Sequence, residues 1–294
     1  MVRLNNEDII DRHKGEVAVI CAHGPTLSEN LTPILRLQEI NKIVRFSANN
    51  WFDFIHEDRH PDYWVLASNI DTVENYSHKM NRSGAKILFA DSVDMTSYEW
   101  IEDNLKNDYY PYDQRHFQGH GCLEILKNFK QHCVQNKNFD FSKYGNNTTM
   151  WQPPFAGTPG GLDIKGRCCH RASNRKTLQE ILQENTGHDQ HYSAGSTVAL
   201  HMIAFSILMG FRKVFISGLD LDYSLGYAGN AIDAPEDFWK NSPETKNLIN
   251  DLNILNDSAN KKGVEIVNLN PGVWYGVFKQ AENIDIEAKD TEFL

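Results

Sequence analysis

Two carboxylates that could do chemistry, Asp220 and Asp222, stand directly after an apolar segment at residues 214–217. The segment is β-branched and aromatic, which is typical of an interior parallel strand. In open α/β sheets ligands bind just beyond the carboxyl ends of the strands, so both carboxylates fall where catalytic groups usually lie. We therefore predict a catalytic role for Asp220 and Asp222, against the alternative that Asp220 only caps a turn.

A loop of small residues, 193–197, precedes an apolar run at residues 198–210. The run is too long and too rich in Ala, Met and Leu for a strand, so we predict a buried helix that ends at Gly210. Backbone N–H groups at the beginning of such a helix form a site for a phosphate or a carboxylate. His191 stands just before the loop, and because imidazole titrates near neutral pH we predict it as a proton-transfer group. The alternative is an ordinary hydrogen-bonded histidine.

The first strand is predicted over residues 17–22, and a Gly-Pro turn and a helical pattern to about Ile40 follow it. Gly24 permits the backbone to approach a ligand closely, and Thr26 adds a hydroxyl group there. Ser28 is the predicted N-cap of the helix. The turn has no Walker lysine and is weaker than a GxGxxG fingerprint, so a structural turn and a phosphate loop both stay open.

Two further predicted strands, at residues 43–47 and 63–67, are followed by asparagines rather than by acids. Asn49 and Asn69 each offer a hydrogen-bond donor and an acceptor without charge, which suits contact with a base or sugar edge. The alternative is that asparagine is simply a common turn residue. Together with the Gly-Pro turn, the two endings predict a polar rim along one edge of the sheet.

The order of these elements predicts an α/β fold: a Rossmann-like, mostly parallel sheet with helices on both faces. Residues 100–190 interrupt the alternation with aromatic, irregular sequence, which predicts an inserted cap. The expected organisation is therefore a first half over residues 1–99, the cap over 100–190, a second half over 191–285 and an acidic tail over 286–294.

Composition excludes several classes of protein. The 294 residues carry a net charge of −10, which argues against a nucleic-acid partner. No apolar segment is long enough to span a membrane, and the first residues lack the apolar centre of a signal peptide, so we expect a cytoplasmic protein. The five cysteines have no CxxC spacing and predict neither a disulfide framework nor a zinc site. A homo-oligomer stays open.

The sequence also resembles a known group of transferases. The turn Gly24-Pro25-Thr26-Leu27 resembles the GPSL loop of bacterial CMP-sialic-acid-dependent sialyltransferases of the Campylobacter type. The block from residue 193 to residue 220 resembles the second conserved block of those enzymes. It is also similar to the 6-hydroxymethylpterin diphosphokinase (MptE-like) family and to the flagellin-modifying Maf glycosyltransferases. The resemblance covers about residues 16–95 and 190–275.

This resemblance implies roles for particular residues. The implied nucleotide contacts are Gly24, Pro25, Thr26, Asn49, Asn69, Ser193, Gly195 and Ser196. Asp220, Tyr223 and Tyr227 would line the same cleft. The sialyltransferases carry a histidine general base in a Gly-His-Ser context, where this chain has Trp239-Lys240-Asn241-Ser242-Pro243. His191 or Asp222 would then have to be the base, or the reaction differs.

Three functions follow as alternatives. The first is a glycosyltransferase that moves a nucleotide-activated sugar, with a CMP-linked acidic sugar as one candidate donor, to a glycan acceptor without an obligatory cofactor. The second is a 6-hydroxymethylpterin diphosphokinase-like enzyme, in which Asp220 and Asp222 hold Mg²⁺ for pyrophosphoryl transfer from ATP. The third is a non-catalytic protein that binds a nucleotide or sugar.

Overall fold

The computed structural model describes residues 1–53, 55–56, 58–66, 70–90, 103–112, 176–190, 192, 197–221 and 243–285. The strands are β1 (Val17–Cys21), β2 (Val44–Ala48), β3 (Tyr63–Leu66), β4 (Lys86–Ala90), β5 (Tyr109–Tyr112), β6 (Lys213–Ser217), β7 (Glu265–Asn268) and β8 (Lys279–Gln280). The α-helices are α1 (Leu27–Glu39), α2 (Ile70–Arg82), α5 (Leu178–Thr186), α6 (Val198–Leu208) and α8 (Pro243–Lys262). Short 3₁₀ turns, η1 and η2, lie at Asn6–Asp8 and Trp51–Asp53.

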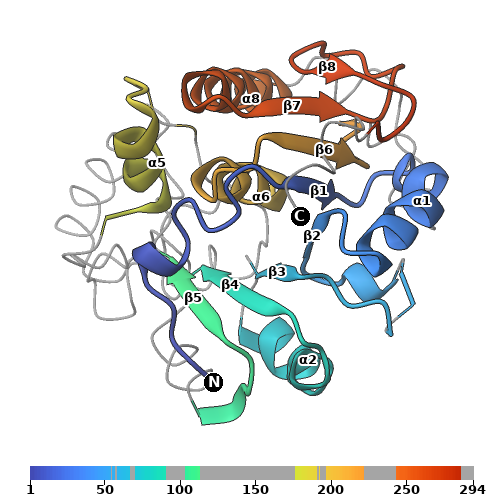
Figure 1. Cartoon of the computed structure of the whole chain (residues 1–294), viewed down its shortest axis with the longest axis vertical. Coiled ribbons are helices and arrows are strands. Elements are labelled where there is room, and N and C mark those ends of the chain that lie inside the picture. The colour runs from blue at the N-terminus through green and yellow to red at the C-terminus, as the bar shows by residue number, and fades with distance from the viewer. Residues whose placement is uncertain are drawn as a thin grey trace, which may run out of the picture.

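The strands form one sheet in the order β5-β4-β3-β2-β1-β6-β7-β8, and every neighbouring pair is parallel (Figure 1). From β1 the chain adds strands in one direction as far as β5. From β6, which pairs with the other edge of β1, it adds strands in the opposite direction. The strand order therefore reverses between β1 and β6, and this boundary is the topological switch point of the sheet.

Helices cover both faces of the sheet, as predicted. Alternate residues of β3 separate the two sides: Tyr63 and Val65 pack in the core that contains α6, whereas Trp64 and Leu66 pack in a second cluster with α2. Helix α1 packs over the same face as α2, through Leu27 and Ile34. Figure 1 shows α1 and α2 on one side of the strands and α5, α6 and α8 on the other.

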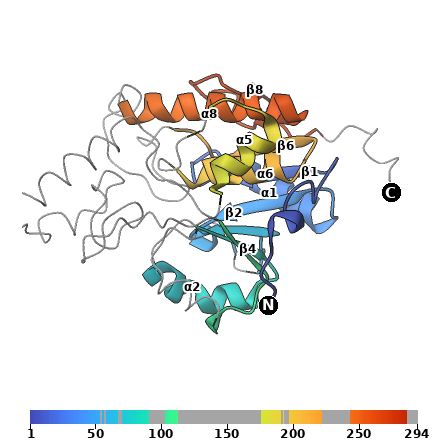
Figure 2. The same cartoon turned by 90° about the vertical axis from the view of Figure 1, so that its left-hand side faces the viewer.

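Helix α6 is apolar around its whole circumference, and every residue from Ala199 to Leu208 is buried. It lies between the sheet and the outer helices α5 and α8 (Figure 2), so it has no solvent-facing side. Gly210 follows it with a φ of +77°, a left-handed conformation that ends the helix. The predicted buried helix before β6 is confirmed.

Two local expectations from the sequence are wrong. Helix α1 begins at Leu27 with Thr26 as its N-cap, so Ser28 lies in the first turn and is not the cap. Residues 109–112, expected to be irregular, form strand β5. Pro111 is tolerated there because β5 is the last strand of its edge, where a missing backbone N–H leaves no central ladder incomplete.

Much of the expected cap and the tail from residue 286 lie outside the described residues, so the domain boundaries stay predictions. Of the expected cap range, β5 belongs to the sheet, and α5 packs against α6 and α8. Among the helices that the structure describes, none combines the length and apolar character needed to cross a membrane.

Gly218, directly after β6, provides a test of the close approach between the two halves of the sheet. Its φ is +78°, and an added Cβ would lie 2.5 Å from the carbonyl oxygen of Ala22. Gly263 has a φ of +76° with open space around it. We expect Gly263→Ala to destabilise the chain by about 1 kcal/mol through backbone strain alone. Gly218→Ala should lose a further 1–3 kcal/mol, roughly, through overpacking.

Chemical denaturation of both variants measures the difference. Equal losses of stability would contradict the proposed close contact between the β1 and β6 loops.

Candidate functional site

The loops that follow β1 and β6 lie side by side at the switch point. The parallel pairing runs to Cys21 and Ser217 and then continues beyond the strands. The backbone N–H of Ala22 donates to the Ser217 carbonyl at 2.8 Å, and that of Gly24 donates to the Gly218 carbonyl at 2.8 Å. The Gly24-Pro25-Thr26 turn is therefore fixed against the beginning of the Gly218–Asp220 segment, as two adjacent parallel strands require.

The carboxylate of Asp220 holds this region together. It accepts hydrogen bonds from the backbone N–H of Thr26 at 3.0 Å and from the hydroxyl of the same residue. The Nδ2 of Asn270, beyond β7, donates to it at 2.9 Å. The Asp220 side chain is buried, with only 5% of the residue exposed. One carboxylate thus connects the ends of β1, β6 and β7, and hydrogen bonds to an ionised group are the stronger class.

Further amides and a phenol support the same three loops. The Nδ2 of Asn30, in the first turns of α1, donates to the Thr26 carbonyl at 3.2 Å and to the Leu269 carbonyl at 3.4 Å. The hydroxyl of Tyr275 donates to the Leu219 carbonyl at 2.7 Å. Burial raises the pKa of Tyr275, and the Asp220 charge adds to the rise, so the phenol remains a donor at any physiological pH.

Gly24 is the residue of this turn at which there is no room for a side chain. An added Cβ would meet a carboxylate oxygen of Asp220 and would lie 2.5 Å from the Gly218 carbonyl oxygen. Helix α1 begins three residues later, so its N-terminus follows directly from the turn. The Thr26 hydroxyl makes no capping bond to α1, because the Thr26 backbone is helical, with φ −66° and ψ −12°, and not extended as in a usual N-cap. The hydroxyl donates to Asp220. The positive end of a 13-residue helix therefore stands at the switch point and favours a negative ligand group.

Asn49 follows the next strand, β2, in a left-handed conformation with a φ of +42°. Its backbone N–H donates to the Val65 carbonyl at 3.0 Å, and its carbonyl accepts from the Trp64 indole at 2.9 Å. Because β2 pairs with β1, Asn49 lies on the same edge of the sheet as the Gly24 turn. Its role as a nucleotide contact stays a prediction.

Several residues of the site were not found from the sequence. Asn30 donates from α1 to the Leu269 carbonyl, and Asn270 donates from beyond β7 to Asp220. These contacts join positions far apart in the sequence, and no local pattern reveals them. His23 immediately precedes Gly24. Burial lowers the pKa of His23 to about 4, whereas a hydrogen bond to the Ala48 backbone and the charge of Asp53 act in the opposite direction. The imidazole is therefore neutral at pH 7.

The structure brings together Gly24, Pro25, Thr26 and Asp220 of the predicted site, with Asn49 on the neighbouring strand end. The remaining predicted site residues lie outside the described residues: Asn69, His191, Ser193, Gly195, Ser196, Asp222, Tyr223 and Tyr227. Within the described part of the chain, no three His, Cys, Asp or Glu side chains are grouped to hold a metal ion. Since Asp222 is outside that part, magnesium binding by Asp220 and Asp222 stays a prediction.

No protein-family profile matches the chain, and no curated protein matches it. Solved structures do match at low identity. The sialyltransferase CstII from Campylobacter jejuni in complex with cytidine-5'-monophosphate has 14% identity and a TM-score of 0.42, over 91% of this chain and 85% of that one. The monofunctional alpha-2,3-sialyltransferase Cst-I from Campylobacter jejuni has 13% identity and a TM-score of 0.41, over 92% and 81% of the two chains. Similarity at this distance does not assign an activity.

The buried His23 predicts a pH dependence of stability. Its pKa is lowered on folding, so between pH 6.5 and pH 4 the unfolded chain binds a proton that the folded chain does not. Stability should therefore be complete above pH 6.5 and fall as the pH decreases toward 4. At about 1.4 kcal/mol per pKa unit, the loss attributable to His23 is about 2–3 kcal/mol.

Denaturation of the wild type and of His23→Asn across this pH range measures the contribution, because the other titrating groups are common to both chains. Parallel pH profiles for the two proteins would show that His23 is not protected from protonation.

Proposed function

We propose that this chain is a transferase that binds a nucleotide-activated sugar at the switch point and passes the sugar to a glycan acceptor. The observation that carries the proposal is the Gly24–Thr26 turn, held by Asp220 between the ends of β1 and β6. Open parallel sheets bind their ligands at such a reversal of strand order. The fixed turn and the N-terminus of α1 offer a preorganised environment for the phosphate of a nucleotide.

The preferred donor is a CMP-linked acidic sugar. This choice rests on the Gly24-Pro25-Thr26-Leu27 turn and its resemblance to the loop of the sialyltransferases. In the reaction a base takes the proton of the acceptor hydroxyl, the new glycosidic bond forms at the anomeric carbon, and the nucleotide phosphate departs with the electrons of the broken bond. His191 and Asp222 are the proposed candidates for the base. Backbone dipoles at α1 stabilise the departing phosphate, so no metal is obligatory.

Asp220 acts in this proposal as a positioning residue. Its oxygens accept hydrogen bonds from the Thr26 amide, the Thr26 hydroxyl and the Asn270 amide. A carboxylate occupied in this way fixes the shape of the turn. Because the N–H groups of Gly24 and Thr26 already donate to the Gly218 carbonyl and to Asp220, the positive end of α1 is what attracts a phosphate to the turn. A direct catalytic role for Asp220 stays a prediction from the sequence.

A thermal-shift panel of CMP, CDP, UDP, GDP, ATP and AMP, with and without Mg²⁺, tests the class of ligand. A ligand that binds only the folded chain raises its apparent stability according to the ratio of ligand concentration to Kd. We expect stabilisation by CMP or CDP that does not depend on Mg²⁺. Stabilisation by ATP only in the presence of Mg²⁺ would contradict sugar transfer and favour the diphosphokinase alternative. No stabilisation by any of the six would contradict nucleotide binding.

The position of the site is tested with Gly24→Ala and a matched glycine. An added Cβ at Gly24 would displace the Asp220 carboxylate or the Gly218 carbonyl, whereas at Gly84 it would meet nothing within 4 Å. We expect Gly24→Ala to weaken CMP binding at least about tenfold, a loss of about 1.4 kcal/mol in binding free energy. Gly84→Ala should bind as the wild type does.

Isothermal titration gives both dissociation constants, and thermal unfolding establishes that each variant is folded. Unchanged CMP affinity in a folded Gly24→Ala variant would show that the ligand does not bind at this turn.

A further inference from the structure

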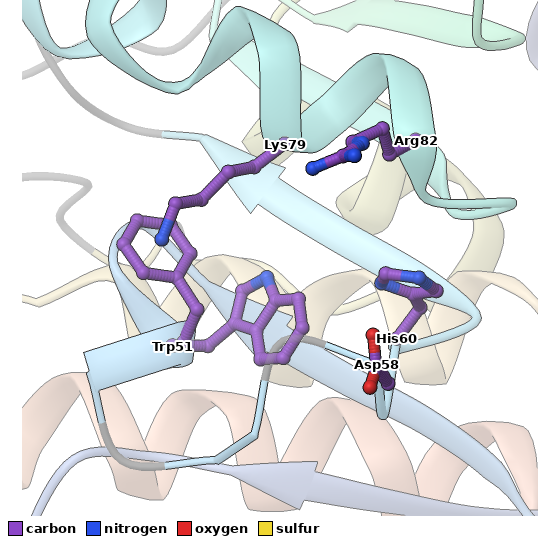
Figure 3. Close-up of a pocket in the computed structure, with 6 residues that line it drawn as sticks. Trp51, Asp58, His60, Lys79 and Arg82 are labelled. Atoms are coloured by element: carbon purple, nitrogen blue, oxygen red, sulfur yellow. The ribbon is translucent and has the colours of Figure 1, made fainter.

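A cavity lies between two parts of the chain: η2 with the segment after it, and the end of α2. Its volume is about 440 Å³, within the range of roughly 300–1,000 Å³ that small-molecule sites occupy. The lining residues come from these two parts of the chain: Trp51, Phe52, Asp58, His60, Lys79 and Arg82. Figure 3 shows Lys79 and Arg82 reaching from α2 toward the side where Trp51 and His60 lie.

The lining of this cavity differs from that of the nucleotide site proposed above, because it includes neither the Gly24–Thr26 turn nor Asp220. Helix α2 ends at Arg82, shortly before β4 begins at Lys86. The last turn of α2 therefore lies at the amino edge of the sheet. The other wall, η2, follows β2 and Asn49, so this side of the cavity is near the proposed nucleotide site. The aromatic side of the cavity belongs to the core cluster of Trp51, Trp64 and Met80, on the face opposite α6.

The charge of the cavity lining is positive in a chain that is strongly negative. Lys79 and Arg82, three residues apart, lie on the same face of α2. The lining contains one carboxylate, Asp58. Its side chain is 83% exposed and lies 3.3 Å from His56. In the described part of the chain, no hydrogen bond or ion pair holds the Arg82 guanidinium. The lining therefore attracts anions despite the net charge of −10.

The aromatic wall of the cavity is rigid. Trp51 is only 2% exposed and packs edge-on against Trp64, with ring centroids 5.5 Å apart. The Arg45 guanidinium lies 5.7 Å from the centre of the Trp51 ring and donates a hydrogen bond to the Arg59 carbonyl. Arg45 thus links Trp51 to Arg59, the residue before His60 of the lining. The Nζ of Lys79 lies 3.8 Å from the centre of the Phe52 ring, so one cation already stands over an aromatic face.

We infer that this cavity binds a small planar organic anion. The ring of such a molecule packs against Phe52, which Trp51 supports through an edge contact, and its carboxylate or phosphate accepts charge-assisted hydrogen bonds from Lys79 and Arg82. Neither part is sufficient alone, because the aromatic wall provides contact area and the two cations provide selection for an anion. The site is a second ligand site of the chain and does not depend on the proposed transfer reaction.

Isothermal titration with two probes tests this site: 2-naphthoate and 2-naphthyl phosphate, which share a ring and differ in the anion. We expect at least one of them to bind with one-to-one stoichiometry and a sub-millimolar Kd. Lys79→Gln and Arg82→Gln should each weaken that binding about tenfold or more, because each removes one cation from the lining. The uncharged 2-naphthol and ring-free acetate should bind much more weakly than the best probe.

Lys86→Gln is the matched control. Lys86 also lies over an aromatic ring, with its Nζ 5.6 Å from the centre of Tyr63, but it does not line the cavity. It should retain the wild-type affinity for the probe. Gly24→Ala should also retain it, whereas Lys79→Gln should retain CMP binding, so failure at one site is distinguishable from failure at the other. Absence of binding by both probes would overturn the inference. So would 2-naphthol binding as tightly as the best probe, or Lys79→Gln and Arg82→Gln binding that probe as tightly as the wild type.

Discussion

The carboxyl edge of this fold depends on one buried carboxylate. Removing the charge of Asp220 from water is unfavourable by several kcal/mol, and the cost is offset only because directed donors surround it. Those donors come from residues 194 and 50 positions away in the sequence, Thr26 and Asn270. The hydrogen bonds therefore join the strand-turn-helix unit of the first half of the sheet to the two central strands of the second half. This connection gives the Gly24 turn a defined shape where the strand order reverses.

The same charge shapes what the site can bind. The negative charge of Asp220 lies at the beginning of α1 and partly offsets the positive end of that helix. A phosphate at the turn therefore gains only part of its stabilisation from the positive end of α1. We expect base and ribose contacts, for which Asn49 on the neighbouring strand end is a candidate, to contribute the rest of the affinity. Such a site favours a whole nucleotide over an isolated phosphate.

Much of this architecture could be predicted from the sequence, because it is encoded locally. The short apolar run of β1 before a Gly-Pro turn, the mostly apolar α6 and the β-branched β6 each carry their pattern within about a dozen residues. The position of Asp220 at a strand end followed from the same patterns. The sequence also indicated the Gly24 turn. The structure gives the reason for glycine there, because a Cβ at this position would clash with Asp220 and with the Gly218 carbonyl.

The missed features share a different cause. The N-cap of α1 was misplaced because Thr26 precedes the helix in a helical conformation and makes no side-chain capping bond, and its hydroxyl donates to Asp220, a partner that no local rule can identify. Strand β5 was missed because Pro111 and three tyrosines read as an irregular segment, and only its position at the sheet edge makes the proline compatible with a strand. His23 and Asn270 are ordinary turn residues in sequence. His23 contacts the Ala48 backbone and Asn270 contacts Asp220, and these long-range contacts give them their roles.

The central claim is that the turn held by Asp220 is where the ligand phosphate binds. A crystal structure of the chain with CMP tests this most directly. We predict the phosphate beside the Gly24–Thr26 turn, at the positive end of α1, with the Asp220–Thr26 hydrogen bonds intact. A phosphate bound elsewhere on the molecule, or a turn left without ligand at saturating CMP, would contradict it.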